Sequence, residues 1–251
     1  MRLTVLASGS SGNALVVEAD GTAILVDCGV SCRQIETRLR AAGVDIERLI
    51  AVLLTHEHSD HVRGIEVFLR RHPLPLAATA GTAKALDGAL TDVEVLQSGR
   101  EVRFGSLSVL PFAVSHDARE PVGFVVNHAG RRVGLFTDSG VATALAVERL
   151  SGCDALLLEA NHDLDMLRLG PYPWVLKQRI ASRTGHLSNE QAQVLLDRLV
   201  HPRLQLVVGM HLSRQNNSPE LARRELGRPL DGSSTRLALA HQDEPLSFEL
   251  A

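Results

Sequence analysis

Residues 49–61 read LIAVLLTHEHSDH, an unbroken apolar run that leads directly into four candidate metal ligands within six residues. A continuous apolar run of this kind is typical of a strand buried on both faces. His56 and His58 can point their imidazoles the same way from an extended loop, whereas Asp60 and His61 turn onto a following helix. The stretch therefore predicts a buried strand whose loop serves two metal ions. A polar loop with incidental histidines is the alternative, and the density of ligands argues against it.

Other strand-like apolar runs also end in polar side chains. Runs at 22–26, 107–114, 132–137, 155–159 and 204–210 lead to Asp27, His116, Asp138, Glu159 and His211. In a layered α/β protein such strand ends converge at one edge of a sheet, so these distant residues can share one site. Helices are predicted over 31–42, 62–72 and 189–199, and a hairpin over 122–137. We detect no internal repeat.

Composition limits the class of protein. The 251 residues suit one large domain, and 45% hydrophobic with 22% charged residues is ordinary for a soluble globular chain. The first apolar run is short and no long apolar stretch follows, which predicts a cytoplasmic protein with no membrane segment. Cys28, Cys32 and Cys153 are too sparse for a disulfide framework or a structural zinc site. A net charge of −3 means that nucleic acid could bind only through a local basic patch or metal.

The HxHxDH string at 56–61 resembles the signature of the metallo-β-lactamase superfamily. The segments LVDCG at Asp27, SHD at His116, TDSG at Asp138 and MHLS at His211 resemble its other motifs, in the same order. The resemblance implies an α/β fold, the αββα sandwich, as a single domain over 1–251. The short intervals between these motifs leave no room for a β-CASP insertion or a tRNase Z-type arm.

The resemblance also implies a ligand set for two divalent metal ions. One ion would be held by His56, His58 and His116, and the other by Asp60, His61 and His211. Asp138 would bridge them, and Asp27 would orient the ligand loop. Histidine and carboxylate ligands without thiolate suit zinc or manganese and leave a metal-bound hydroxide as nucleophile.

Local residues favour one branch of the superfamily. Asp138 stands where class B1 lactamases carry cysteine, which disfavours a lactamase. The segments ASGSSGN, ANHD, GPYPWVLKQRI, GHLSN and HLSRQNNSP resemble the YycJ/WalJ group of bacterial nucleases, related to the tRNase Z branch. This likeness implies a phosphodiesterase, specifically a DNA-directed exonuclease. It also implies that His186 is the general acid, that Glu159 holds its other ring nitrogen, and that Asp60 is catalytic.

Alternatives stay open at several positions. His186 could instead belong to a helix N-terminal region in which Ser188 is the cap and Gln191 the third helical residue. The SGSSGN loop can cradle a phosphate or simply form a tight turn. Further substrate contacts are predicted around it and after two strands: Ser8, Ser10, Ser11, Asn13, His162, Ser213 and Asn216. Tyr172 and Trp174, near Lys177 and Arg179, can stack on a strand end or pack the loop or a dimer interface.

Three functions are compatible with these residues. A metal-dependent nuclease with a nucleic-acid substrate, DNA rather than RNA, fits the motifs best. A glyoxalase-II-like thioesterase or other small-molecule hydrolase of the same fold is the second reading. A metal-binding protein without catalytic activity is the third, and it would require lost ligands, whereas every motif position is filled.

Overall fold

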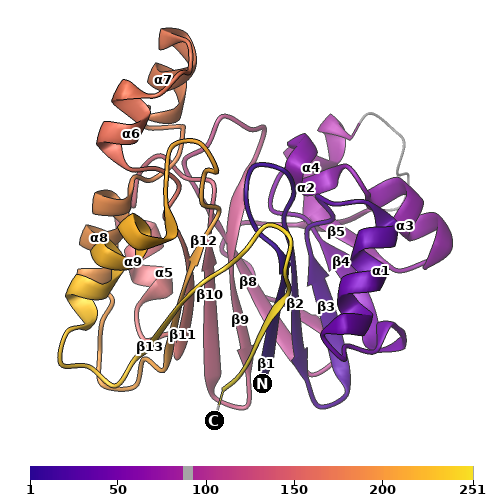
Figure 1. Ribbon diagram of the computed structural model, residues 1–251. Coiled ribbons are helices and arrows are strands. Elements are labelled where there is room, and N and C mark those ends of the chain that lie inside the picture. Colours follow the sequence, from indigo (N-terminus) through magenta and orange to yellow (C-terminus); the bar gives the residue numbers. More distant parts are fainter. Residues whose placement is uncertain (87–92, 251) are drawn as a thin grey trace.

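Two β-sheets lie face to face in the computed structural model, which describes residues 1–86 and 93–250 (Figure 1). Within the described residues the first sheet has the strand order β14 (Leu246–Glu249), β1 (Arg2–Ala7), β2 (Ala14–Ala19), β3 (Thr22–Val26), β4 (Leu49–Leu53), β5 (Leu76–Thr79) and β6 (Val93–Leu96). The second has the order β13 (Arg236–Leu239), β12 (Leu206–Met210), β11 (Ala155–Glu159), β10 (Arg131–Phe136), β9 (Val122–His128), β8 (Leu107–Ala113) and β7 (Val102–Phe104).

Both sheets change from antiparallel to parallel pairing along their width. From β14 to β3 the neighbours run antiparallel, and from β3 to β6 they run parallel. From β7 to β10 they are again antiparallel, and from β10 to β13 parallel. Parallel strands place their carboxyl ends at the same edge, which is why the loops after β3, β4, β10, β11 and β12 meet.

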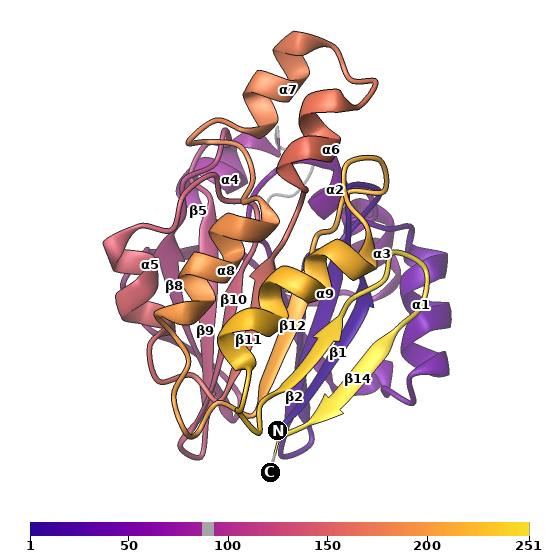
Figure 2. The same cartoon turned by 60° about the vertical axis from the view of Figure 1, so that its left-hand side comes forward.

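Helices cover the outer faces of the two sheets (Figures 1 and 2). The first sheet is covered by α1 (Cys32–Ala41), α2 (Ser59–Val62), α3 (Ile65–Arg71) and α4 (Ala80–Ala85), with a 3-10 turn at Ile46–Arg48. The second is covered by α5 (Ala144–Leu150), α8 (Asn189–Asp197) and α9 (Pro219–Gly227), with a 3-10 turn at Arg228–Leu230. The helices α6 (Leu164–Leu169) and α7 (Trp174–Ile180) project beyond the sandwich. The predicted αββα architecture is confirmed.

The hydrophobic core has three layers, as this architecture requires. The central layer lies between the sheets and includes Leu53, Phe124 and Val208. An outer layer packs the first sheet against Ile35 and Phe68 of the helices, and another packs the second sheet against α5, α8 and α9. Strand β4 contributes Ala51 and Leu53 to the central layer and Val52 to an outer one. Its burial on both faces is therefore as its sequence predicts.

The predicted helices are partly confirmed. Ser31 begins α1 and Ser188 begins α8, each through a capping box with the glutamine three residues later. The single helix predicted over 62–72 is wrong, because the chain breaks at Gly64 between α2 and α3. The Gly64 N–H donates to the Cys28 carbonyl at 2.8 Å, and a Cβ on Gly64 would lie 2.1 Å from the Val30 carbonyl oxygen. The close approach of the 28–30 loop therefore prevents a continuous helix.

The three cysteines are buried and unpaired, as expected. None of the helices in residues 1–86 and 93–250 combines the length and apolar character that a bilayer crossing requires.

Candidate metal centre

The predicted ligands gather at the carboxyl ends of the parallel strands, between the two sheets. Two groups of donor atoms, each with all members within 4.8 Å of one another, comprise His56, His58 and His116, and Asp60, His61, Asp138 and His211. The first group combines the loop after β4 with the loop after β8. The second combines that same β4 loop and α2 with the loops after β10 and β12. All seven residues predicted to bind metal are thus brought together.

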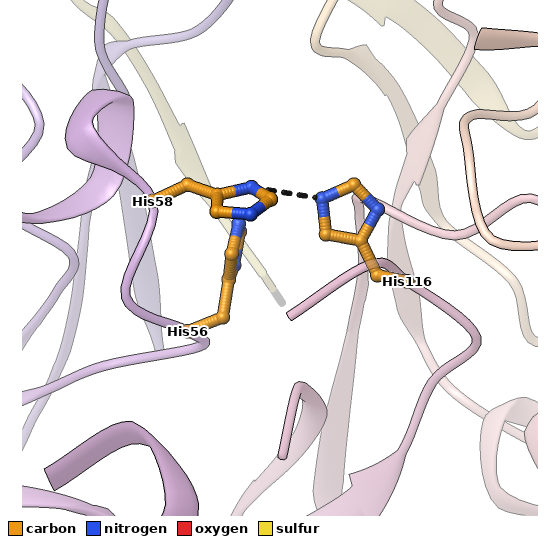
Figure 3. A group of neighbouring side chains, drawn as sticks. All are labelled: His56, His58 and His116. Carbon is orange, nitrogen blue, oxygen red and sulfur yellow. Dashed lines mark hydrogen bonds between the residues drawn. The ribbon is translucent and has the colours of Figure 1, made fainter. Parts of the chain in front are cut away.

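The first group is a set of three converging imidazoles (Figure 3). The Nε2 of His116 lies 3.1 Å from Nδ1 of His58, while its Nδ1 lies 3.1 Å from the Gly185 carbonyl oxygen. The Nδ1 of His56 lies 3.0 Å from the Thr55 hydroxyl, and its Nε2 is buried without a hydrogen-bond partner. Burial lowers the pKa of His56 well below its usual value, because the charged imidazolium is poorly solvated there.

The second group combines two imidazoles with two carboxylates. The Nε2 of His61 lies 3.3 Å from Asp138 Oδ2 and 3.6 Å from Asp60 Oδ2. The Nε2 of His211 lies 3.5 Å from Asp60 Oδ2. Burial lowers the pKa of His61, but the neighbouring Asp138 and Asp27 carboxylates outweigh it and raise that pKa well above its ordinary value.

Asp138 connects the two groups. Its side chain is almost fully buried, with Oδ1 3.1 Å from Nδ1 of His211 and 4.0 Å from Nε2 of His116. Burial alone would raise the pKa of this carboxyl, but His211 and His61 hold it well below its usual range. Its backbone is left-handed, with φ of 54°. Non-glycine residues rarely adopt this conformation, although aspartate tolerates it better than most.

Asp27 holds the histidine loop from behind. Its Oδ2 lies 2.8 Å from Nδ1 of His61, and its Oδ1 accepts hydrogen bonds from the backbone N–H and hydroxyl of Thr55. The aspartate thus fixes the ring that carries one predicted ligand atom and the residue that precedes the ligand string. The superfamily resemblance implies an orienting role for Asp27, and this contact is compatible with that role.

Glu159 is fully buried and contacts two histidines. Its Oε1 lies 2.8 Å from Nδ1 of His186 and 3.0 Å from Nδ1 of His211, and its Oε2 accepts from the backbone N–H groups of Ser139 and Leu187. Burial opposes ionisation, but the two histidines outweigh it and lower the pKa of Glu159 to about 2. Burial also disfavours the charged form of His186 and by itself would lower the pKa of this imidazole. The Glu159 carboxylate outweighs burial, so the pKa of His186 is raised. Glu159 therefore favours the charged form of His186.

The donor set fits divalent metal ions. Three buried atoms of the site, His56 Nε2, Asp138 Oδ2 and His211 Nε2, have no hydrogen-bond partner. Buried polar atoms of this kind are rare unless an ion or another ligand satisfies them. The four carboxylates of Asp27, Asp60, Asp138 and Glu159 also concentrate negative charge in one buried place, which favours a cation. Imidazole with carboxylate is a donor set for zinc or manganese rather than for calcium.

Four of the predicted substrate contacts are buried and already bonded within the protein. The Ser8 hydroxyl accepts from the His211 N–H at 2.7 Å, and Asn13 Nδ2 lies 3.1 Å from His61 Nε2. The Ser213 hydroxyl accepts from the Asn216 N–H at 3.1 Å. Ser8 and Asn13 therefore touch the ligands themselves. Their contact with substrate stays a prediction. In the structure each of them also contacts a candidate metal ligand, Ser8 contacting His211 and Asn13 contacting His61.

The other predicted substrate contacts differ in exposure. Ser10 and Ser11 lie exposed at the tip of the loop between β1 and β2, where the Ser11 N–H donates to Gln242 Oε1 at 3.0 Å. His162 is buried, and this burial lowers its pKa to about 4. Its Nδ1 has no hydrogen-bond partner.

Two residues beside the ligands escaped the sequence-based prediction. Thr55 contacts Asp27, His56 and His61, and its place directly before the ligand string was the available signal. Asp117 follows His116 in the SHD segment, and its Oδ1 lies 3.6 Å from Nε2 of His116. Its Oδ2 accepts from Arg179 Nε at 2.5 Å. This ion pair links α7 to the ligand loop, a contact that no local pattern reveals.

A further cluster of Cys32, Glu36 and His72 lies on α1 and α3, away from the sheet edge. Its carboxylate already contacts Arg71 at 3.1 Å and His72 at 2.9 Å. Because the Arg71 guanidinium already neutralises the Glu36 carboxylate, we interpret this cluster as a network of ion pairs rather than as a second metal centre.

Comparison with known proteins agrees with this fold. A family profile described as the beta-lactamase superfamily domain matches residues 22–211. The chain belongs to this superfamily, and with its clustered histidines and aspartates it is a metal-dependent hydrolase.

Among curated relatives, the chain is similar to exodeoxyribonuclease YycJ of Bacillus anthracis, at 37% identity over 92% of this chain and 89% of the relative. It is 36% identical to exodeoxyribonuclease WalJ of Streptococcus pneumoniae over 88% and 85% of the two chains. Ribonuclease Z of Methanopyrus kandleri matches only 41% of this chain and 39% of its own length, at 37% identity.

Solved structures share the fold over nearly the whole chain. The metallo-beta-lactamase fold protein YhfI of Bacillus subtilis superposes with a TM-score of 0.76 at 17% identity, covering 98% of this chain and 99% of that one. Zn²⁺-bound PqqB of Methylobacterium extorquens superposes with a TM-score of 0.74 at 19% identity, covering 100% of both chains. At these identities the likeness shows the fold alone.

We expect Asp27→Asn to weaken metal binding about 10- to 100-fold, because the amide cannot hold His61 as the carboxylate does. Asparagine tolerates the left-handed backbone of this position, where φ is 63°. The matched control is Asp20→Asn, an exposed aspartate with φ of 47° in a turn. Calorimetric titration of metal-free protein with Zn²⁺ measures the affinity, and circular dichroism checks the fold. Equal affinities for the two variants would contradict the orienting role.

Proposed function

We propose that this chain is a dinuclear metal-dependent phosphodiesterase that acts on DNA as an exonuclease. The observation that carries the proposal is the contact of 2.8 Å between Glu159 and His186, placed beside two groups of metal-ligand atoms. Ligands without a neighbouring proton donor would suit many hydrolases. A buried acid pair beside them suits a reaction whose leaving group needs a proton.

The residues divide the metal-binding task between two ions. His56, His58 and His116 would hold one, and Asp60, His61 and His211 the other. Asp138, which approaches both groups, would bridge them. When bound, zinc or manganese would supply Lewis acidity and a hydroxide nucleophile at neutral pH. Asp27 and Thr55 keep the ligand rings in position during this chemistry.

His186 would protonate the departing oxygen. Its Nδ1 is engaged by Glu159, which leaves Nε2 for substrate, and about a fifth of its side chain is exposed, at 21%. The Glu159 carboxylate raises the pKa of this imidazole, which favours the protonated form that a general acid requires. An alkoxide leaving group depends on such an acid, whereas a thiolate, with a parent pKa of about 8.5, departs without one. This contrast favours phosphodiester over thioester hydrolysis.

The helix-capping alternative for His186 does not compete with this role. Ser188 is the N-cap of α8 and Gln191 completes the capping box, as that alternative expected. His186 lies two residues before the cap, and its ring is turned toward Glu159. The capping residues therefore position the loop that presents the histidine, and both interpretations describe the same segment.

DNA is the proposed polymer because the relatives that match most of the chain are named exodeoxyribonucleases. The ribonuclease Z relatives match a shorter part of it. RNA is therefore the competing substrate. A nucleic-acid substrate also agrees with the cytoplasmic location expected from the sequence, which stays a prediction.

The proposed function is tested with Mn²⁺-loaded protein and four substrates: end-labelled single-stranded DNA, a matched RNA strand, bis-p-nitrophenyl phosphate and a glutathione thioester. We expect DNA to be shortened progressively from one end, and Asp60→Ala to abolish this activity without unfolding the protein. Faster cleavage of the thioester than of any phosphodiester would overturn the proposal. Faster cleavage of RNA than of DNA would correct the substrate.

The ligand set predicts two metal ions per chain. Elemental analysis of protein saturated with Mn²⁺ or Zn²⁺ should give about two equivalents, because seven donors exceed the four of one tetrahedral ion. Asp138→Asn should lower the content, whereas the exposed Asp165→Asn should not. A wild-type content that never exceeds one equivalent would contradict the dinuclear assignment.

His186→Ala should separate acid catalysis from metal binding. We expect normal metal content and at least a hundredfold lower turnover on DNA, since a positioned acid contributes roughly 10²- to 10⁴-fold. Bis-p-nitrophenyl phosphate releases a good leaving group, so its turnover should fall far less. An equal loss on both substrates would indicate a binding or structural role, and no loss on either would remove His186 from the mechanism.

A further inference from the structure

The helices α6 and α7 form a hairpin that stands away from the sandwich (Figures 1 and 2). No residue of α7 is buried, and Leu167 alone is buried in α6. Leu169, Trp174 and Val175 are 75%, 68% and 77% exposed. Helices this short are marginal in water without packing partners. A hairpin with exposed apolar side chains and almost no buried residues therefore indicates a surface that receives a ligand.

The hairpin and the residues that follow it carry more basic than acidic side chains, although the protein as a whole is acidic. Residues 164–183 contain four basic side chains, Arg168, Lys177, Arg179 and Arg183, against the single carboxylate Asp165, whereas the whole chain has a net charge of −3. The local excess of positive charge favours a polyanion and disfavours the same surface of a second copy. This is the basic patch that the overall charge requires of a nucleic-acid-binding protein.

The base of the hairpin reaches the candidate metal centre. Arg179, near the end of α7, donates to Asp117, whose other oxygen lies 3.9 Å from Nε2 of His58. Trp174 begins the same helix, about 8 Å further along the axis at the usual helical rise. That distance corresponds to about two nucleotides at the ~3.4 Å spacing of stacked bases.

We propose that the α6–α7 hairpin binds the single strand next to the cleaved linkage, with a base stacked on Trp174 and the backbone beside Lys177. The proposal rests on the proposed phosphodiesterase function and adds to it the element that holds the polymer. An exposed indole offers a stacking face to any base, which suits an enzyme that acts along a strand without regard to sequence. Arg179 is a positioning residue that ties this surface to the ligand loop.

Trp174 is the only tryptophan of the chain, so intrinsic tryptophan fluorescence reports directly on the proposed contact. Metal-loaded Asp60→Asn protein, which should leave the strand uncut, is titrated with single-stranded DNA. We expect saturable quenching of the fluorescence. The absence of quenching at concentrations where the strand binds, measured by anisotropy of a labelled oligonucleotide, would overturn the proposal whether or not the protein proves to be a nuclease.

Kinetics of otherwise wild-type protein provide the second test. Stacking on an aromatic ring contributes about 1–3 kcal/mol per base, so Trp174→Ala should raise KM for single-stranded DNA roughly 5- to 150-fold, and Trp174→Phe much less. Turnover of bis-p-nitrophenyl phosphate should stay unchanged, because it cannot reach the hairpin. Lys177→Gln should lower the salt dependence of DNA binding by about one unit of slope, whereas Lys84→Gln on α4 should not.

Two outcomes count against the hairpin as a strand-binding element. An unchanged KM for DNA in Trp174→Ala would overturn it. So would a change of oligomeric state in that variant, measured by sedimentation velocity, with equal losses on both substrates, because the apolar surface would then join two copies. Failure of the wild-type protein to cleave any phosphodiester would instead refute the proposed function, and the fluorescence titration would still decide the binding.

Discussion

The carboxylate of Asp138 sits almost without solvent between two groups of histidines, and the rest of the site is arranged around it. Removing an isolated charge from water costs several kcal/mol unless opposite charge and hydrogen bonds compensate. His61 and His211 approach this carboxylate from opposite sheets, at 3.3 and 3.1 Å. The two sheets must therefore close on each other for the charge to be tolerated, which couples the sandwich architecture to the chemistry.

Five imidazoles of the site share one arrangement: a protein group outside the seven candidate ligands holds one ring nitrogen, and the other nitrogen is left for the site. Thr55 holds His56, Asp27 holds His61, and a backbone carbonyl holds His116. Glu159 does the same for both His186 and His211. Each such contact selects a tautomer and a ring orientation before any ligand binds.

The sequence was sufficient to predict most of the elements that bury apolar runs and the candidate ligands that the structure brings together after them. A strand such as β4 is buried on both faces and is therefore apolar at consecutive positions, so its sequence alone is enough to predict it. The break at Gly64 depends on a carbonyl of the 28–30 loop, and the role of Ser8 depends on the backbone of a residue two hundred positions away. Contacts of this kind are created by tertiary structure and have no local signal. Similarly, the sequence shows the basic residues of 164–183, but it does not show that they lie beside the candidate metal centre.

The change from antiparallel to parallel pairing at β3 and at β10 has a consequence for how the molecule is constructed. The two sheets share the same order of antiparallel and parallel pairing, although no repeat was found in the sequence. Each sheet ends its central strand in a left-handed aspartate followed two positions later by a glycine that packs against a carbonyl oxygen, Asp27 with Gly29 and Asp138 with Gly140. Asp27 contacts Thr55 and His61 of the loop that carries the histidines. Asp138 faces His61 and His211. Because each group of candidate ligands draws members from the loops of both sheets, neither half alone would hold a metal ion, and the proposed centre depends on how the two sheets meet.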